Sequence, residues 1–162
     1  MCRSTGHASG SGWTWAGAGS GSVWAGVVEI PDPNLKAALE KSLGKNVGDS
    51  ITDSELRTLK ELSASQLGII DLTGLEHCTS LVKLHLWKNQ ITNLSPLSNL
   101  INLNTLYLWT NKISDTSSLA KMTSLEHLDL GGNQITNITP LANLTGLVKL
   151  NLGWNPISKT LA

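Results

Sequence analysis

The hydrophobic positions of the C-terminal half repeat every 22 residues and fit neither a helix nor a simply alternating strand. Segments such as "LHLWKNQITNL" and "LYLWTNKISDT" share a leucine–x–leucine core that is closed by asparagine, and the leucines fall at Leu84, Leu106, Leu128 and Leu150. Because side chains alternate along a strand, both leucines of each core lie on one face of a short strand. A fixed period of this length predicts stacked units, with strands about 4.8 Å apart in a parallel sheet.

An asparagine follows each predicted strand at a fixed position. A buried amide at such a bend can bond backbone groups that the turn leaves unpaired, so we expect a structural asparagine ladder. An earlier, degenerate copy at 59–80 has Leu67 in that position, which predicts a less regular first turn. After the asparagine, the apolar positions at 91, 94, 97 and 100 are expected to return along the opposite side and close the core. The ladder consists of Asn89, Asn111, Asn133 and Asn155.

Two short helices are predicted before the repeats, within 28–58. Asp32 followed by Pro33 is typical of a helix start, and the helix is expected to run to Gly44 with an apolar stripe. Thr52 and Glu55 have the spacing of a capping box, which marks a second helix start. Since the terminal unit of a repeat stack must be covered, we expect these helices to form a cap.

The full pattern, L-x-x-L-x-L-x-x-N-x-I-x-x-I/L-x-x-L-x-x-L, resembles the leucine-rich repeat family. The 22-residue unit and the helical segment from about Val28 resemble the bacterial internalin-type subclass. The resemblance implies an α/β solenoid, a right-handed superhelix with a parallel concave sheet, a 3₁₀ or extended convex side and a helical N-terminal cap. The domain organisation is then a leader at 1–27, a cap at 28–58 and repeats at 59–162, about four full and one partial.

The leader is rich in glycine, serine and alanine, with three tryptophans between them. Glycine at this density makes ordering costly, so we expect residues 1–27 to be disordered. The resemblance implies secretion or attachment to the cell surface. A signal peptide needs an unbroken apolar run, and glycines and serines interrupt every such run here, so the compartment stays unknown.

The positions that face outward from the predicted strands form columns with one member per repeat. Trp87 and Trp109 should be neighbours about 5 Å apart, with His85 and Tyr107 beside them, and Gly131, Gly132 and Gly153 should leave a shallow floor next to them. Because Trp and Tyr dominate interface hot spots, these columns predict a non-catalytic protein–protein interaction module that binds through the concave face. The candidate partner-binding residues are His85, Trp87, Tyr107, Trp109, Asp129 and Trp154.

Three other interpretations remain open. The adjacent aromatic rings could stack on sugar faces, which would make the partner a carbohydrate. The chain could be a structural module of a larger bacterial surface protein. The aromatic side chains could also shield each other and bind nothing.

Several classes of function are disfavoured. Twelve basic and twelve acidic residues are scattered without a basic cluster, which argues against nucleic acid. Ser63, His85 and Asp129 share a column, but two strand steps, about 10 Å, separate His85 from Asp129, too far for a catalytic triad. No metal-ligand spacing or cofactor motif is present, so the prediction is no enzyme, no cofactor and no metal.

Two further residues and the chain end carry expectations. Cys78 occupies a position that is Leu100 or Met122 in later repeats, which predicts a small buried apolar side chain. His77 should lie on the convex side in solvent. The chain stops inside the fifth repeat, so the strand near 147–152 is expected to be an unpaired edge through which the protein self-associates.

Overall fold

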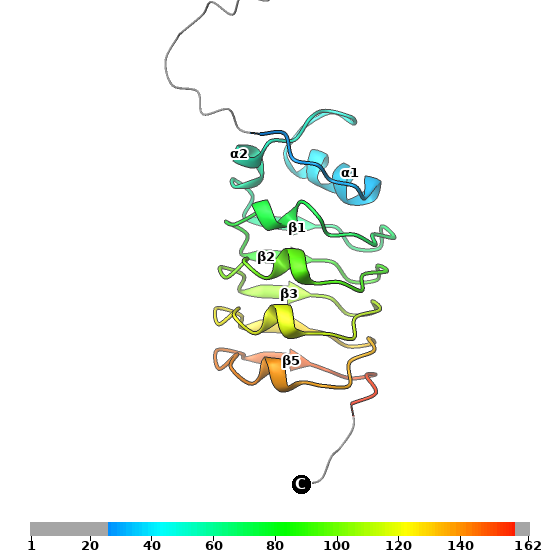
Figure 1. The fold of residues 1–162 in the computed structure, drawn as a ribbon, viewed down its shortest axis with the longest axis vertical. Helices are drawn as coiled ribbons and strands as arrows, with labels where there is room; N and C mark the ends of the chain where they lie inside the picture. The colour runs from blue at the N-terminus through cyan, green and yellow to red at the C-terminus, as the bar shows by residue number, and fades with distance from the viewer. Residues whose placement is uncertain (1–25, 158–162) are drawn as a thin grey trace, which may run out of the picture.

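The computed structural model describes residues 26–157, which form a stack of repeats beneath a helical cap (Figure 1). The disorder predicted for the leader concerns residues that lie almost entirely outside this range. The helices are α1 (Pro33–Ser42) and α2 (Asp53–Leu56), the strands are β1 (Glu61–Ser63), β2 (Lys83–His85), β3 (Thr105–Tyr107), β4 (His127–Asp129) and β5 (Lys149–Asn151), and the single-turn 3₁₀ helices are Leu75–His77, Ser95–Leu97, Ser117–Leu119 and Thr139–Leu141.

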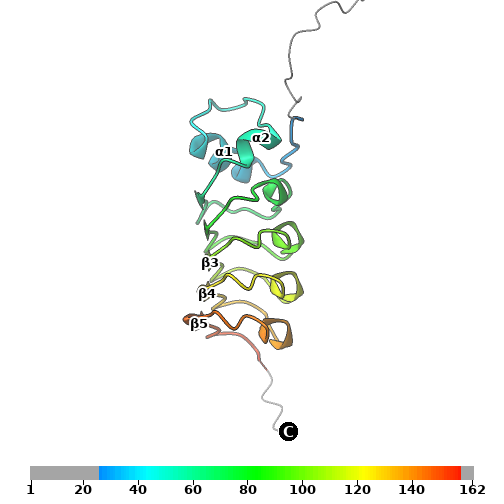
Figure 2. The ribbon, with the colours of Figure 1, turned by 90° about the vertical axis from the view of Figure 1, so that its left-hand side faces the viewer.

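The strands form one parallel sheet in the order β1-β2-β3-β4-β5. Each residue pairs with the residue 22 positions later, as Leu62 does with Leu84 and Leu84 does with Leu106. Figure 2 shows the strands along one side of the stack and the 3₁₀ turns along the other. The predicted solenoid, with a parallel sheet opposite 3₁₀ turns, is confirmed.

Leucine and isoleucine fill the space between the sheet and the 3₁₀ turns. Cys78 and Met122 occupy equivalent positions in this core, and both side chains are completely buried. Burial, with a smaller contribution from the charge of Glu76, raises the pKa of the Cys78 thiol to about 12. The thiol therefore stays protonated at neutral pH, and the prediction that Cys78 acts as a small apolar core residue is confirmed.

The asparagine after each of β2 to β5 bonds the backbone of its own repeat and of the one before. Asn111 Nδ2 donates to Leu86 O at 3.0 Å and Leu108 O at 2.9 Å, while its Oδ1 accepts from Ile91 N at 3.1 Å. Asn89, Asn133 and Asn155 repeat this arrangement. Each amide thus joins two consecutive turns, and a carbonyl oxygen such as that of Leu86 accepts from the asparagines of both.

The first turn, which lacks this asparagine, differs from the others. Leu67 is 43% exposed, whereas Asn89 in the equivalent position is 8% exposed. Asn89 reaches back and accepts from the backbone N–H of both Leu67 and Ile69 at 3.1 Å. Gly68 adds a left-handed residue, φ 74°, that the later turns do not have. The second repeat therefore satisfies the backbone of the first.

Asp32 connects the cap to the first repeat. Its Oδ1 accepts from Asn34 N and Leu35 N and so caps α1, and its Oδ2 accepts from Ile70 N and Asp71 N at 2.7 and 3.2 Å. Burial acts to raise the pKa of Asp32, but the four N–H donors outweigh it and hold the pKa below its usual value. One carboxylate thus starts the helix and attaches it to the stack.

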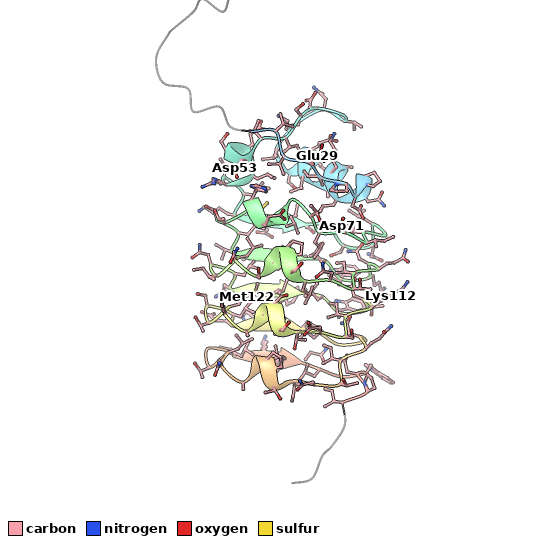
Figure 3. The ribbon with its side chains drawn as sticks, in the orientation of Figure 1. Glu29, Asp53, Asp71, Lys112 and Met122 are labelled. Atoms are coloured by element: carbon pink, nitrogen blue, oxygen red, sulfur yellow. The ribbon has the colours of Figure 1, made fainter. Side chains whose placement is uncertain are left out.

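A second link joins α2 to the first 3₁₀ turn, and it involves His77. His77 Nδ1 lies 2.7 Å from Asp53 Oδ1, and Figure 3 labels Asp53 on α2 beside the first repeat. His77 does lie on the convex side and is partly exposed, at 37% of its side chain, but it also pairs with Asp53, a contact that could not be read from the chain because it depends on the position of α2. The predicted capping box of Thr52 and Glu55 is present.

Candidate interaction face

The outward side chains of the sheet and of the residues just after it form what we call the sheet face. Backbone hydrogen bonds continue beyond the three-residue strands, for example from Leu86 N to Tyr107 O and from Lys88 N to Trp109 O, so the columns stay in register. One column runs His85, Tyr107, Asp129, Asn151, and the next runs Trp87, Trp109, Gly131, Gly153. Thr105, at an outward position of β3, is nevertheless buried, with its hydroxyl donating to Asn104 Oδ1.

The second and third repeats carry an aromatic ridge made of His85, Trp87, Tyr107 and Trp109. The Trp87 and Trp109 ring centroids are 5.0 Å apart with a 5° interplanar angle, and His85 stacks on Tyr107 at 4.9 Å. Both tryptophans are half-buried rather than fully exposed, because each ring covers a face of the other. The strand spacing imposes this stacking, so the ridge is rigid.

Lys88 places a positive charge against the ridge. Its Nζ is 5.5 Å from the Trp87 centroid and 5.1 Å from the Trp109 centroid. Because the centroids are themselves 5.0 Å apart, the ammonium group lies at the side of the stack and attracts both rings weakly. The outer face of Trp109, toward the fourth repeat, is not covered by this lysine.

The fourth and fifth repeats replace rings with small and polar residues. Asp129 Oδ1 accepts from Gly131 N and from Asn151 Nδ2, both at 3.0 Å. Asn151 Oδ1 in turn accepts from Gly153 N at 3.0 Å. A Cβ at Gly131 would lie 2.8 Å from Asn151 Nδ2, so the glycine makes room for this amide. The sheet face is therefore aromatic in one half and polar in the other.

A hollow of about 340 Å³ lies where the two halves meet, and we call it the boundary hollow. Trp109 and Trp154 border it on different repeats, and Asp129 and Asn151 contribute polar atoms. Trp154 is 94% exposed. The boundary hollow is lined by Trp109, Thr110, Asp129, Gly131, Gly132, Asn151 and Trp154.

The backbone is left-handed at the residue just before the asparagine position of each repeat, which is position 67, 89, 111, 133 or 155. The φ values are 62° at Gln66, 53° at Lys88, 55° at Thr110, 64° at Gly132 and 59° at Trp154. This conformation is unfavourable for bulky and β-branched side chains. Sequence reasoning missed it, although a glycine in one copy, Gly132, was a signal. It also missed Lys88, Thr110 and Asn151 as members of the site.

The register of the sheet keeps His85 and Asp129 apart. The register places Tyr107 between His85 and Asp129, so these two side chains are not neighbours. Within residues 26–157 no three histidine, cysteine or acidic side chains gather to hold a metal ion. None of the helices in that range is long and apolar enough to cross a bilayer.

Comparison with known proteins gives the same architecture. A family model described as leucine-rich repeats, in two copies, matches residues 79–121 and 123–162. Internalin H of Listeria monocytogenes is 39% identical over 66 residues, which is 40% of this chain and 12% of that protein. Internalin J of the same species is 34% identical over 65 residues, 40% of this chain and 7% of that protein. The chain thus spans only a small part of these relatives.

A crystal structure of an internalin, inlF, from Listeria monocytogenes superposes with a TM-score of 0.80 at 37% sequence identity. The match covers 86% of this chain and 43% of that one, so it extends beyond the repeats. The chain belongs to the leucine-rich repeat family and is of the bacterial internalin type. Proteins of this family are generally not catalytic.

Proposed function

We propose that this protein is a non-catalytic interaction module that binds a protein partner through the sheet face, centred on the aromatic ridge. The observation that carries the proposal is the parallel stack of Trp87 on Trp109 with Tyr107 and His85 alongside. Similarity to internalins supports an interaction role but names no partner.

The energetics of the ridge favour a partner. Aromatic side chains in fixed positions lose little conformational freedom on binding, and each can bury a large apolar area. The parallel sheet already holds these rings in place, so binding would not have to order them. Mutual stacking covers one face of each indole, yet the position next to Trp109 is Gly131, which presents no side chain to its other face. Shielding alone therefore does not account for the arrangement.

The test is affinity capture from whole-cell extracts, read by quantitative mass spectrometry. The wild-type protein is compared with a Trp87→Ala, Trp109→Ala double variant whose fold is checked by circular dichroism. A matched control, Ile70→Ala with Ile101→Ala, removes two exposed apolar side chains outside the ridge. We expect one protein to be retained by the wild type and the control and lost by the double variant. Equal capture by all three would refute the ridge as the binding site.

We also infer that the molecule contacts a second copy of itself through β5. In the described residues β5 pairs with β4 on one side only, and its side chains, together with Val148, are exposed. An unpaired strand edge offers N–H and C=O groups that another strand can bond. This supports self-association at the β5 edge as an activity separate from the sheet face.

A further inference from the structure

The boundary hollow combines flat aromatic walls with short polar side chains. We propose that it binds the pyranose ring of a neutral glycan, in a subsite that shares Trp109 with the protein-binding ridge and extends from it to the fifth repeat. The inference does not depend on the protein partner, since its ligand is defined by the chemistry of the hollow alone.

The two tryptophans border the hollow from the third and the fifth repeat, whose backbones are two strand spacings, about 10 Å, apart. Glycines 131 and 132 provide the floor, and a Cβ at Gly132 would approach Thr110 Oγ1 to 3.3 Å. The C–H face of a pyranose above this floor could stack on an indole at a contact distance of about 3.5–4.0 Å.

The polar rim offers both acceptors and donors. In residues 26–157 the side-chain hydrogen bonds of Asp129 all go to Oδ1, which leaves Oδ2 able to accept. Asn151 Nδ2 uses one N–H on Asp129 and has a second to donate. Thr110 adds a hydroxyl at the rim. Sugar hydroxyls both donate and accept, so they match this mixed set better than a purely cationic or anionic group does.

The charges around the hollow favour a neutral ligand. The ammonium group of Lys88 already lies 5.1 Å from the Trp109 ring centroid, so a second cation on that indole would be repelled. An anion would meet the carboxylate of Asp129. Lys88 and Asp129 carry opposite charges, so a basic side chain is attracted by one and repelled by the other, and a phosphate or carboxylate group meets the reverse. Neither ion therefore gains an advantage over a neutral ligand.

Trp154 supplies a second, independent observation. A bulky side chain that is 94% exposed gains almost nothing from burial, and its φ of 59° costs conformational energy in addition. Gly132 shows that glycine serves the same backbone position. Strained, exposed residues of this kind are characteristic of binding sites. A ligand that stacks on the indole would account for the tryptophan.

The experiment is an NMR titration of the uniformly ¹⁵N-labelled chain, observing the indole N–H signals. The probes are the methyl glycosides of glucose, galactose, mannose and N-acetylglucosamine. We expect at least one of them to shift the Trp109 and Trp154 signals along one saturating curve with a millimolar dissociation constant. Absence of saturable shifts with all four probes overturns the proposal.

Matched variants locate the site. Trp154→Gly removes one wall and relieves backbone strain, and Gln66→Gly makes the same conformational change in the first repeat, away from the hollow. We expect Trp154→Gly to weaken glycoside binding about five- to tenfold, and Gln66→Gly to leave it unchanged. Asp129→Leu tests the polar rim and should weaken binding comparably. Equal affinity of all variants and the wild type would place the sugar elsewhere and overturn the proposal.

The sugar could be free or carried by a glycoprotein. Fetuin from which the charged sialic acids have been removed, before and after enzymatic deglycosylation, distinguishes these sources: loss of binding on deglycosylation identifies a protein-borne glycan. The glycoside titration needs no protein partner. If the affinity capture retains no protein through the ridge, the proposed function is refuted and the glycan subsite stands. If the glycoside titration fails, the glycan subsite is refuted and the proposed function stands.

Discussion

At the scale of single residues, the asparagine ladder does more than fill a turn. The amide of Asn111 satisfies Ile91 N and the carbonyl oxygens of Leu86 and Leu108, all of them buried. An unpaired buried group costs about 1–3 kcal/mol. The asparagine therefore contributes to stability mainly because its removal would leave a buried backbone group without a hydrogen-bond partner.

Asn111→Ala should therefore destabilise the protein by about 2–4 kcal/mol, since the buried Ile91 N loses its partner and the carbonyl oxygens of Leu86 and Leu108 each keep only one of two donors. Asn155→Ala deletes the equivalent bonds at a partly exposed position, where water can replace them, and should cost less. Urea unfolding followed by circular dichroism measures both. An equal loss of unfolding free energy in the two variants would mean that burial of the asparagine does not determine how much its removal destabilises the protein.

The residue scale is also where sequence reasoning was least complete. The period predicted which side chains share a column and how closely Trp87 and Trp109 approach, because strand spacing alone fixes both. It did not predict the tilt of Asn151 toward Asp129 or the left-handed backbone at Thr110, because these depend on contacts between repeats. Residues whose conformation depends on a neighbour 22 positions away cannot be placed by local pattern.

At the scale of elements, α2 shows how a four-residue helix is held in place. Glu55 accepts from Lys45 Nζ at 2.6 Å and from the backbone N–H of Thr52 at 2.8 Å. The hydrogen bond from Lys45, then those from Thr52, lower the pKa of Glu55 to about 2. Local capping signals predicted both helix starts. The contact between Lys45 and Glu55 could not be predicted in this way, because it forms only when the loop between the helices folds back.

The lowered pKa of Glu55 has a defined consequence for stability. A carboxyl whose pKa is depressed in the folded state stabilises that state above its unfolded pKa, near 4.5, and loses this contribution as the pH falls toward about 2. We therefore expect stability to decline between pH 4.5 and pH 2, and Glu55→Gln to reduce that decline. The decline that remains in Glu55→Gln should come from Asp32 and Asp53, whose pKa values are also lowered.

Thermal unfolding at a series of pH values measures this effect. Glu126→Gln makes the same chemical change at an exposed residue outside the cap and serves as the control. If the melting temperatures of Glu55→Gln and the wild type fell in parallel over this range, the carboxylate of Glu55 would not be the group responsible.

At the scale of the whole molecule, stability is transmitted from repeat to repeat. Each unit contacts its neighbours, as the register of β1 to β5 shows, and Asp32 and Asp53 attach the cap to the first of them. In such a stack the terminal units are the most weakly held. The cap end is closed by helices, whereas at β5 the leucines that line the core of other repeats become partly exposed.

The proposed self-association through β5 rests on this exposed edge. Val148 is 72% exposed beside the strand, and a lysine there would place a charge in any contact between two edges. We expect the wild type to show a mass that increases with concentration in multi-angle light scattering, and Val148→Lys to remain monomeric. Val47→Lys adds the same charge at a 92% exposed position in the cap and should behave as the wild type does. A strictly monomeric wild type at high concentration would rule out the β5 contact. Reduced association in both variants would attribute the effect to net charge, because the Val47 site is at the opposite end of the stack.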